Sequence, residues 1–101
     1  MNVQYSKDFE KSVRKLSGKI LHSIIEMIDE VKVATSVNDI TDCKKIETLN
    51  NVYRIRIGNQ RAFFVLHIFI DGDTVRFEYL FSRGEAYNKK NIEKLRNRDT
   101  K

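Results

Sequence analysis

In the first third of the chain, apolar residues recur at steps of three and four, the spacing that lines one side of a helix. The pattern predicts one helix that begins after Ser6 and a longer one from about residue 19 to residue 34, with Ser17-Gly18 as the break between them. Ser6 is a suitable N-cap, because its hydroxyl can accept from the amide of Phe9. Two helices joined by so short a break predict a helical hairpin. The apolar residues of the longer helix are Ile20, Leu21, Ile24, Ile25, Ile28 and Val31.

After residue 50 the apolar residues change to the two-residue period of β-strands. Val52–Ile57 alternates strictly, and Arg61–Ile70 is a run apolar on both faces, which predicts a central strand. Thr74–Ser82 predicts a third strand. Short polar turns that contain glycine separate the three strands and favour an antiparallel meander. The residues expected on one face of the third strand are Val75, Phe77, Tyr79 and Phe81.

The remaining segments complete an α+β domain. Asn2–Tyr5 predicts a short edge strand, 35–41 a loop, and 86–101 a short C-terminal helix. We therefore expect a single domain over residues 1–101, in which an N-terminal strand and a two-helix hairpin pack on an antiparallel sheet. With both helices on one face of the sheet, the other face is the expected place for a functional site.

The composition narrows the class of protein. Of the 101 residues, 41% are hydrophobic and 33% charged, a balance typical of globular domains. No apolar run reaches the roughly 20 residues that cross a bilayer, and the first residues lack the apolar core of a signal peptide. A cytoplasmic location without membrane association is therefore expected. The single cysteine, Cys43, cannot form an internal disulfide, and no Cys/His cluster predicts a metal or cofactor site.

Positive charge is concentrated in the second half of the chain. Residues 1–43 carry six Lys/Arg and seven Asp/Glu, whereas residues 44–101 carry thirteen and seven, so the second half alone has a net charge of +6. A localised basic surface favours a polyanion or an acidic protein as partner, although the charge would also serve solubility alone.

Three arginines surround the first predicted turn of the sheet. Arg54 and Arg56 alternate with apolar residues and therefore share one face of their strand, and Arg61 begins the next strand. Like charges this close repel unless an anion or a carboxylate lies between them, which favours phosphate binding. Alternatively, the three arginines form a solvent-exposed face of the sheet and pair with glutamates.

A second basic group follows the third strand. Arg83 directly follows that strand, Tyr87 comes four residues later, and Lys89 and Lys90 lie just beyond Tyr87. An aromatic ring among cations is typical of nucleotide binding, with charge for the phosphate and the ring for the base. Tyr87 would alternatively anchor the C-terminal segment to the core. Lys44 and Lys45 add two further cations before the first strand of the meander.

Two stretches of sequence carry a family resemblance. KIETLNNVYRIRIGNQRAFF at residues 45–64 and VRFEYLFSRGEAYNK at residues 75–89 resemble the RelE/ParE superfamily of bacterial type II toxins, nearest to its RelE-like branch. The order of predicted elements also matches, and the likeness covers nearly the whole chain.

The resemblance implies an activity and a partner. RelE-like toxins are metal-independent, cofactor-free mRNA endonucleases that cut messages in the ribosomal A site and inhibit translation, and an antitoxin encoded beside each toxin inhibits it. By position, Arg54, Arg56 and Arg61 match the basic residues of the family's first hairpin, and Arg83 and Tyr87 match its C-terminal Arg and Tyr. We assign catalysis to Arg56, Arg61, Arg83 and Tyr87. We assign RNA binding to Arg54, Lys44, Lys45, Lys89 and Lys90.

The sequence departs from the family pattern at the proton-transfer positions. Arg54 and Arg56 stand where relatives often have lysine, and Phe81 and Ser82 stand where relatives often have His or Arg. Arginine binds phosphate well but is a poor general base. The alternatives are therefore a ParE-like inhibitor of DNA gyrase and a non-catalytic relative that only binds its antitoxin. A partner segment rich in acidic and apolar residues would suit this chain in each case.

Overall fold

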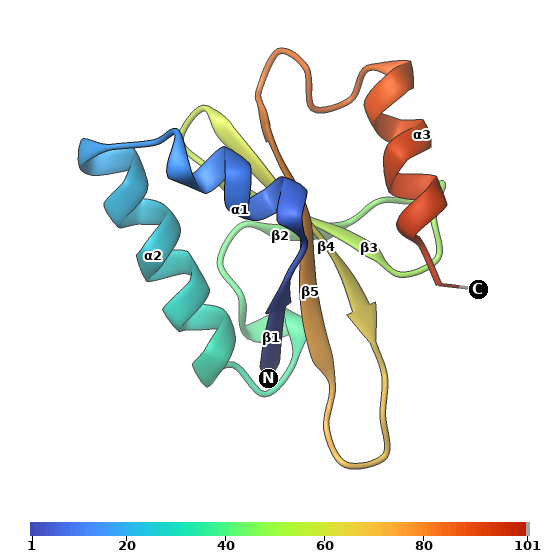
Figure 1. The fold of residues 1–101 in the computed structure, drawn as a ribbon. Helices are drawn as coiled ribbons and strands as arrows, with labels where there is room; N and C mark the ends of the chain where they lie inside the picture. The colour runs from blue at the N-terminus through green and yellow to red at the C-terminus, as the bar shows by residue number, and fades with distance from the viewer. Residues whose placement is uncertain (101) are drawn as a thin grey trace.

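The protein is built on a five-stranded mixed sheet with helices on both faces (Figure 1). The computed structural model describes residues 1–100. The strand order is β1-β5-β4-β3-β2, with β1 parallel to β5 and the other neighbours antiparallel. The elements are β1 (Asn2–Tyr5), α1 (Lys7–Arg14), α2 (Gly18–Val33), a 3₁₀ turn (Val37–Asp39), β2 (Cys43–Lys45), β3 (Val52–Ile57), β4 (Gln60–His67), β5 (Thr74–Ser82) and α3 (Lys89–Arg98).

The predicted α+β class is confirmed, with one strand added to the sheet. The meander corresponds to β3, β4 and β5, and β1 is the expected edge strand. The additional strand β2 pairs with β3, so the sheet is wider than predicted. Ser6 caps α1 as expected, because its Oγ accepts from the Phe9 amide at 3.0 Å.

Two separate apolar cores hold helices against the two faces of the sheet. On one face, α1 and α2 pack through Phe9, Ile24 and Val31 onto the sheet. On the other face, Leu95 of α3 packs with Phe63 and Val65 of β4. The face expected to be open is therefore partly covered by α3, as Figure 1 shows.

A β-bulge in β5 reverses the facing of its aromatic residues. Phe63 lies opposite Tyr79 but Phe64 lies opposite Phe77, so Glu78 is an extra residue on β5. The predicted common face of Val75, Phe77, Tyr79 and Phe81 is therefore wrong. Val75 and Phe77 pack beneath α1 and α2, whereas the rings of Tyr79 and Phe81 belong to the core under α3.

The predicted central strand is shorter than its apolar run. β4 ends at His67, opposite Thr74 at the start of β5, so residues 68–73 form the loop of the hairpin. Ile68, Phe69 and Ile70 are 71%, 55% and 109% exposed in that loop. The extension of the strand to Ile70 is wrong, because these residues have no partner strand across from them.

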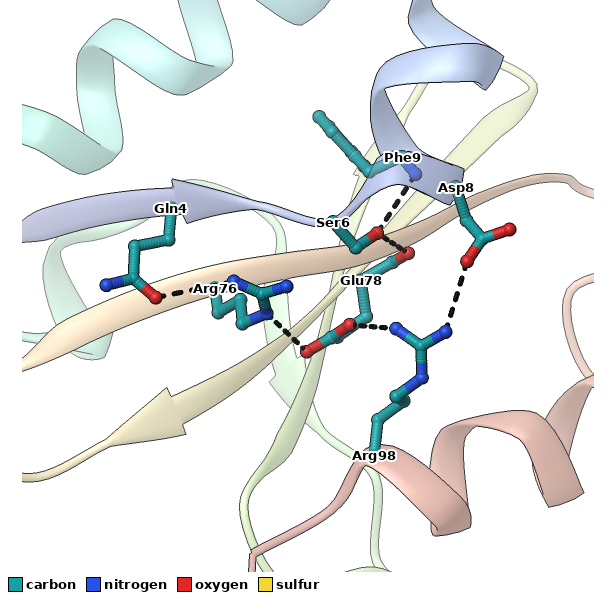
Figure 2. Close-up of polar contacts among 7 residues, drawn as sticks. All are labelled: Gln4, Ser6, Asp8, Phe9, Arg76, Glu78 and Arg98. Carbon is teal, nitrogen blue, oxygen red and sulfur yellow. Dashed lines mark hydrogen bonds and ion pairs between the residues drawn. The ribbon is translucent and has the colours of Figure 1, made fainter.

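A buried carboxylate fixes α3 to the sheet (Figure 2). The Glu78 side chain is 4% exposed and accepts from Arg98 Nη1 of α3 at 2.6 Å and from Arg76 Nε of β5 at 3.1 Å. Arg98 also reaches Asp8 of α1 at 3.1 Å. These bonds join α1, β5 and α3, and they set the position of the helix that borders the candidate site.

Candidate nucleic-acid interface on the α3 face

Two rows of side chains cross the sheet on the face that α3 partly covers. Residues directly opposite each other on neighbouring strands point to the same face. Cross-strand pairing therefore forms one row from Phe81, Arg61 and Arg56, and a second from Tyr79, Phe63, Arg54 and Lys44. In both rows the aromatic residues lie toward β5 and the cations toward β3 and β2. The predicted shared face of Arg54 and Arg56 is thus present.

Arg54 is the centre of the second row. Its Nη1 lies 3.5 Å from the Tyr87 hydroxyl, and its Nη2 donates to the Asp42 carbonyl at 3.3 Å. Its Nε is buried and has no hydrogen-bond partner among residues 1–100. Arg54 therefore holds Tyr87 beside the cations and keeps one donor unused.

Tyr87 is anchored to the core and yet remains accessible. Its ring meets Phe63 edge-on at 6.0 Å, which anchors the segment before α3 to the core. The residue is nevertheless 50% exposed, so its hydroxyl and part of its ring remain accessible. An anchored but accessible ring suits contact with a ligand at this position.

A hollow of about 370 Å³ opens between β3, the segment after β2 and α3. Lys44, Arg54 and Tyr87 line it, and Glu47 supplies the one carboxylate among the eight lining residues. Glu47 has no signal in the sequence, because it lies in a segment without a clear periodicity. The full lining is Lys44, Lys45, Ile46, Glu47, Thr48, Arg54, Tyr87 and Ile92.

Arg61 and Arg56 lie directly opposite each other but differ in environment. Arg61 is 8% exposed, and its Nη1 donates to the carbonyls of Gly58 and Gln60 at 2.8 and 2.9 Å. It therefore stabilises the β3–β4 turn. Arg56 is paired with Asp42 at 3.5 Å, and both side chains are about half exposed, so this ion pair is weak and can be exchanged for another anion.

The remaining predicted site residues fall into two groups. Arg83 is exposed, and its amide donates to the Asn59 carbonyl at 2.8 Å, which places it beside the β3–β4 turn and near Arg61. Lys89 and Lys90 are exposed in the first turn of α3. Lys45 also lines the hollow, but its ammonium already has a partner within the protein, because its Nζ donates to the Leu49 carbonyl at 2.6 Å.

Cys43 faces the opposite core. It lies across from Ile55 and packs beneath α2. Burial raises the pKa of the Cys43 thiol to about 11, with Glu30 adding to the rise and Arg54 opposing it. Because the folded pKa is raised, the associated stability is complete at lower pH and is lost as the pH rises through about 11.

The Cys43 thiol is expected to be unreactive in the folded protein. At about pH 8, alkylation by iodoacetamide should be roughly 100-fold slower than in the urea-unfolded chain, because a two-unit rise in pKa lowers the thiolate fraction by that factor. Mass spectrometry of timed, quenched samples measures both rates. Equal rates in the two states would contradict the buried placement.

Two further features bear on the class of site. Among residues 1–100, no three His, Cys, Asp or Glu side chains lie close enough together to hold a metal ion. No helix in this described range is both long and apolar enough to cross a membrane.

Comparison with known proteins identifies the family. No family model matches the chain. Toxin RelE3 of Methanocaldococcus jannaschii is 36% identical over 89 residues, which cover 87% of this chain and 97% of that protein. The chain belongs to the RelE toxin family. The family assignment confirms the resemblance carried by residues 45–64 and 75–89.

Solved RelE structures share the fold. The toxin in a RelB–RelE antitoxin–toxin complex from Methanococcus jannaschii superposes with a TM-score of 0.67 at 31% identity, covering 83% of this chain and 94% of that chain. An archaeal RelE–RelB complex from Pyrococcus horikoshii gives 0.66 at 21% identity, covering 84% and 97%. The RelBE2 complex of Mycobacterium tuberculosis gives 0.57 at 19%, covering 81% and 96%. The two more distant structures support the fold alone.

Proposed function

We propose that this RelE-family protein is a ribosome-dependent mRNA endonuclease of a toxin–antitoxin system, acting in the cytoplasm to stop translation. The observation that carries the proposal is the hollow that brings Lys44, Arg54, Glu47 and Tyr87 together beside the Arg56–Arg61 pair. Cations for a phosphate, a carboxylate for a proton and an accessible ring for a base are the parts that RNA cleavage needs.

The proposed reaction uses the RNA's own nucleophile. The 2′-oxygen forms a bond to the adjacent phosphorus, and the bond from phosphorus to the 5′-oxygen of the next nucleotide breaks. The products are a 2′,3′-cyclic phosphate and a free 5′-hydroxyl. One proton leaves the 2′-hydroxyl and another reaches the departing 5′-oxygen, so the step is balanced without a metal or a cofactor.

The residues in and around the hollow have separate proposed tasks. Arg54, with its unused buried Nε, and the exposed Arg83 and Arg56 stabilise the negative charge that builds on the phosphoryl oxygens. Glu47 takes the proton of the 2′-hydroxyl. The Tyr87 hydroxyl, which accepts from Arg54 Nη1, gives its own proton to the departing 5′-oxygen. Lys44, Lys89 and Lys90 contact phosphates along the strand, while the buried Arg61 holds the β3–β4 turn in place.

Primer extension on programmed ribosomes tests this function. The wild-type protein should cut within the A-site codon and leave a cyclic phosphate end, and Glu47→Gln should cut about 100- to 10,000-fold more slowly, as expected when a general base is lost. Supercoiling by purified gyrase is measured in parallel. Absence of cuts from the folded wild type would overturn the proposal, and gyrase inhibition would then favour the ParE-like alternative.

An antitoxin is the proposed protein partner. The solved structure that is 31% identical to this chain is a RelB–RelE antitoxin–toxin complex. The net charge of +6 on residues 44–101 favours a partner segment rich in acidic residues. A binding measurement between this chain and the product of the neighbouring gene tests the assignment, and a lack of affinity would contradict it.

A further inference from the structure

The aromatic end of the two rows has no task in the proposed cleavage. Phe81 and Tyr79 stack nearly parallel, with ring centroids 5.2 Å apart and planes 12° apart. Phe63 supports Phe81 from the side at 5.7 Å, tilted by 53°. Phe81 is nevertheless only partly buried, at the margin of the core beneath α3.

The Tyr79 ring of this stack already contacts two cations, Arg98 and Lys94. The Arg98 guanidinium lies 5.0 Å from the centre of the Tyr79 ring, and Glu78 and Asp8 hold that guanidinium in place (Figure 2). Burial raises the pKa of the Tyr79 hydroxyl, with Arg98 opposing the shift. Tyr79 is thus already contacted by Arg98 and Lys94, and Phe81 is the ring of the pair that lies directly opposite Arg61.

The end of the stack lies beside the phosphate-binding cations. Arg61 is directly opposite Phe81, and Arg56 is directly opposite Arg61. Arg56 has only a half-exposed ion pair with Asp42, which a phosphate can replace, whereas Arg61 is already held by two carbonyls of its own turn. A nucleotide with its phosphate at Arg56 would therefore bring its base toward Phe81.

We propose that Phe81 is a stacking platform for an RNA base, one that favours purines, next to the proposed cleavage site. The inference rests on the proposed function for its RNA ligand. A purine has the larger surface for stacking on an aromatic ring, and sequence preferences of this kind come from stacking strength rather than from hydrogen bonds to base edges. Phe81 is then a specificity-determining residue, distinct from the groups that move protons.

The chain contains no tryptophan, so Phe81→Trp introduces a single fluorophore at the platform. Its emission should fall when a short oligoadenylate is added, and it should not change with an abasic sugar-phosphate strand of the same length. Phe69→Trp is the matched control, because Phe69 lies in the β4–β5 loop and is 55% exposed. Its emission should be unaffected by either strand. Quenching of Phe81→Trp by both strands or by neither would overturn the proposal.

A second measurement separates stacking from folding. Phe81→Leu retains an apolar side chain for the core and should weaken oligoadenylate binding by about 5- to 150-fold, the range for loss of one base–aromatic stack. Phe81→Leu should also lose the preference for oligoadenylate over oligouridylate. If Phe81 were only structural, the substitution would lower the affinities for both strands equally. These experiments need neither ribosomes nor cleavage. If the protein stacks an RNA base on Phe81 but does not cut mRNA, the proposed cleavage is wrong and the stacking role of Phe81 stands.

Discussion

Replacing Arg54 with alanine is expected to slow mRNA cleavage by about 100- to 1000-fold, the usual effect of removing one donor that stabilises a developing oxyanion. Arg54 lines the hollow, contacts the Tyr87 hydroxyl at 3.5 Å and holds a buried Nε that has no hydrogen-bond partner within residues 1–100. Its loss removes charge from the phosphate site and releases Tyr87. Single-turnover primer extension on programmed ribosomes measures the effect.

Two variants make this prediction specific. Arg14→Ala removes the same charge from α1, where the side chain is 75% exposed, and should leave the cleavage rate within about twofold of wild type. Arg54→Lys retains the charge but loses the planar donors, so its rate should fall between the two. If Arg54→Ala cut as fast as Arg14→Ala while both remained folded, the assignment of the site to this hollow would be wrong.

Replacing Glu78 with alanine is expected to lower the free energy of unfolding by about 3 kcal/mol. The Glu78 carboxylate is 4% exposed and is the shared acceptor of Arg76 and Arg98. Breaking a buried ion pair from one side commonly costs about 3–5 kcal/mol, because the remaining charge is left without a partner. We expect the lower end of this energy range, because the side chains of Arg76 and Arg98 are 37% and 35% exposed and retain some contact with water.

Urea unfolding followed by far-UV circular dichroism measures this loss. Glu93→Ala is the control, because Glu93 pairs with Arg96 on the surface of α3 at 3.3 Å and is 56% exposed. That variant should change the free energy of unfolding by no more than about 0.5 kcal/mol. A loss below about 1 kcal/mol for Glu78→Ala would show that the network in Figure 2 does not hold α3 on the sheet.

Local sequence patterns located the helices and the strands of the meander. The Ser6 cap, the break at Gly18 and the alternation of Val52–Ile57 depend on interactions within a few residues, so the sequence alone predicts them. The apolar run 61–70 was misleading at its end, because a strand also needs a partner. β5 begins only at Thr74, and three apolar residues are therefore left in an exposed loop.

The composition of the site was less predictable than its basic charge. The alternation around Arg54 and Arg56 placed two cations on one face, and the structure agrees. Glu47 was missed because only the packing of the segment after β2 against Tyr87 and Ile92 brings it into the hollow. Arg61 was assigned to catalysis, but its guanidinium donates to two carbonyls of its own turn.

By itself, the sequence determined the α+β class, the family and the concentration of positive charge in the second half, since these follow from periodicity, motif and composition. Only the tertiary structure decided which side chains meet. One extra residue at Glu78 moves Tyr79 and Phe81 to the face of the arginines, and ion pairs to the buried Glu78 carboxylate fix α3 beside them. Both depend on pairing between residues distant in the chain, which periodicity along a single strand does not record.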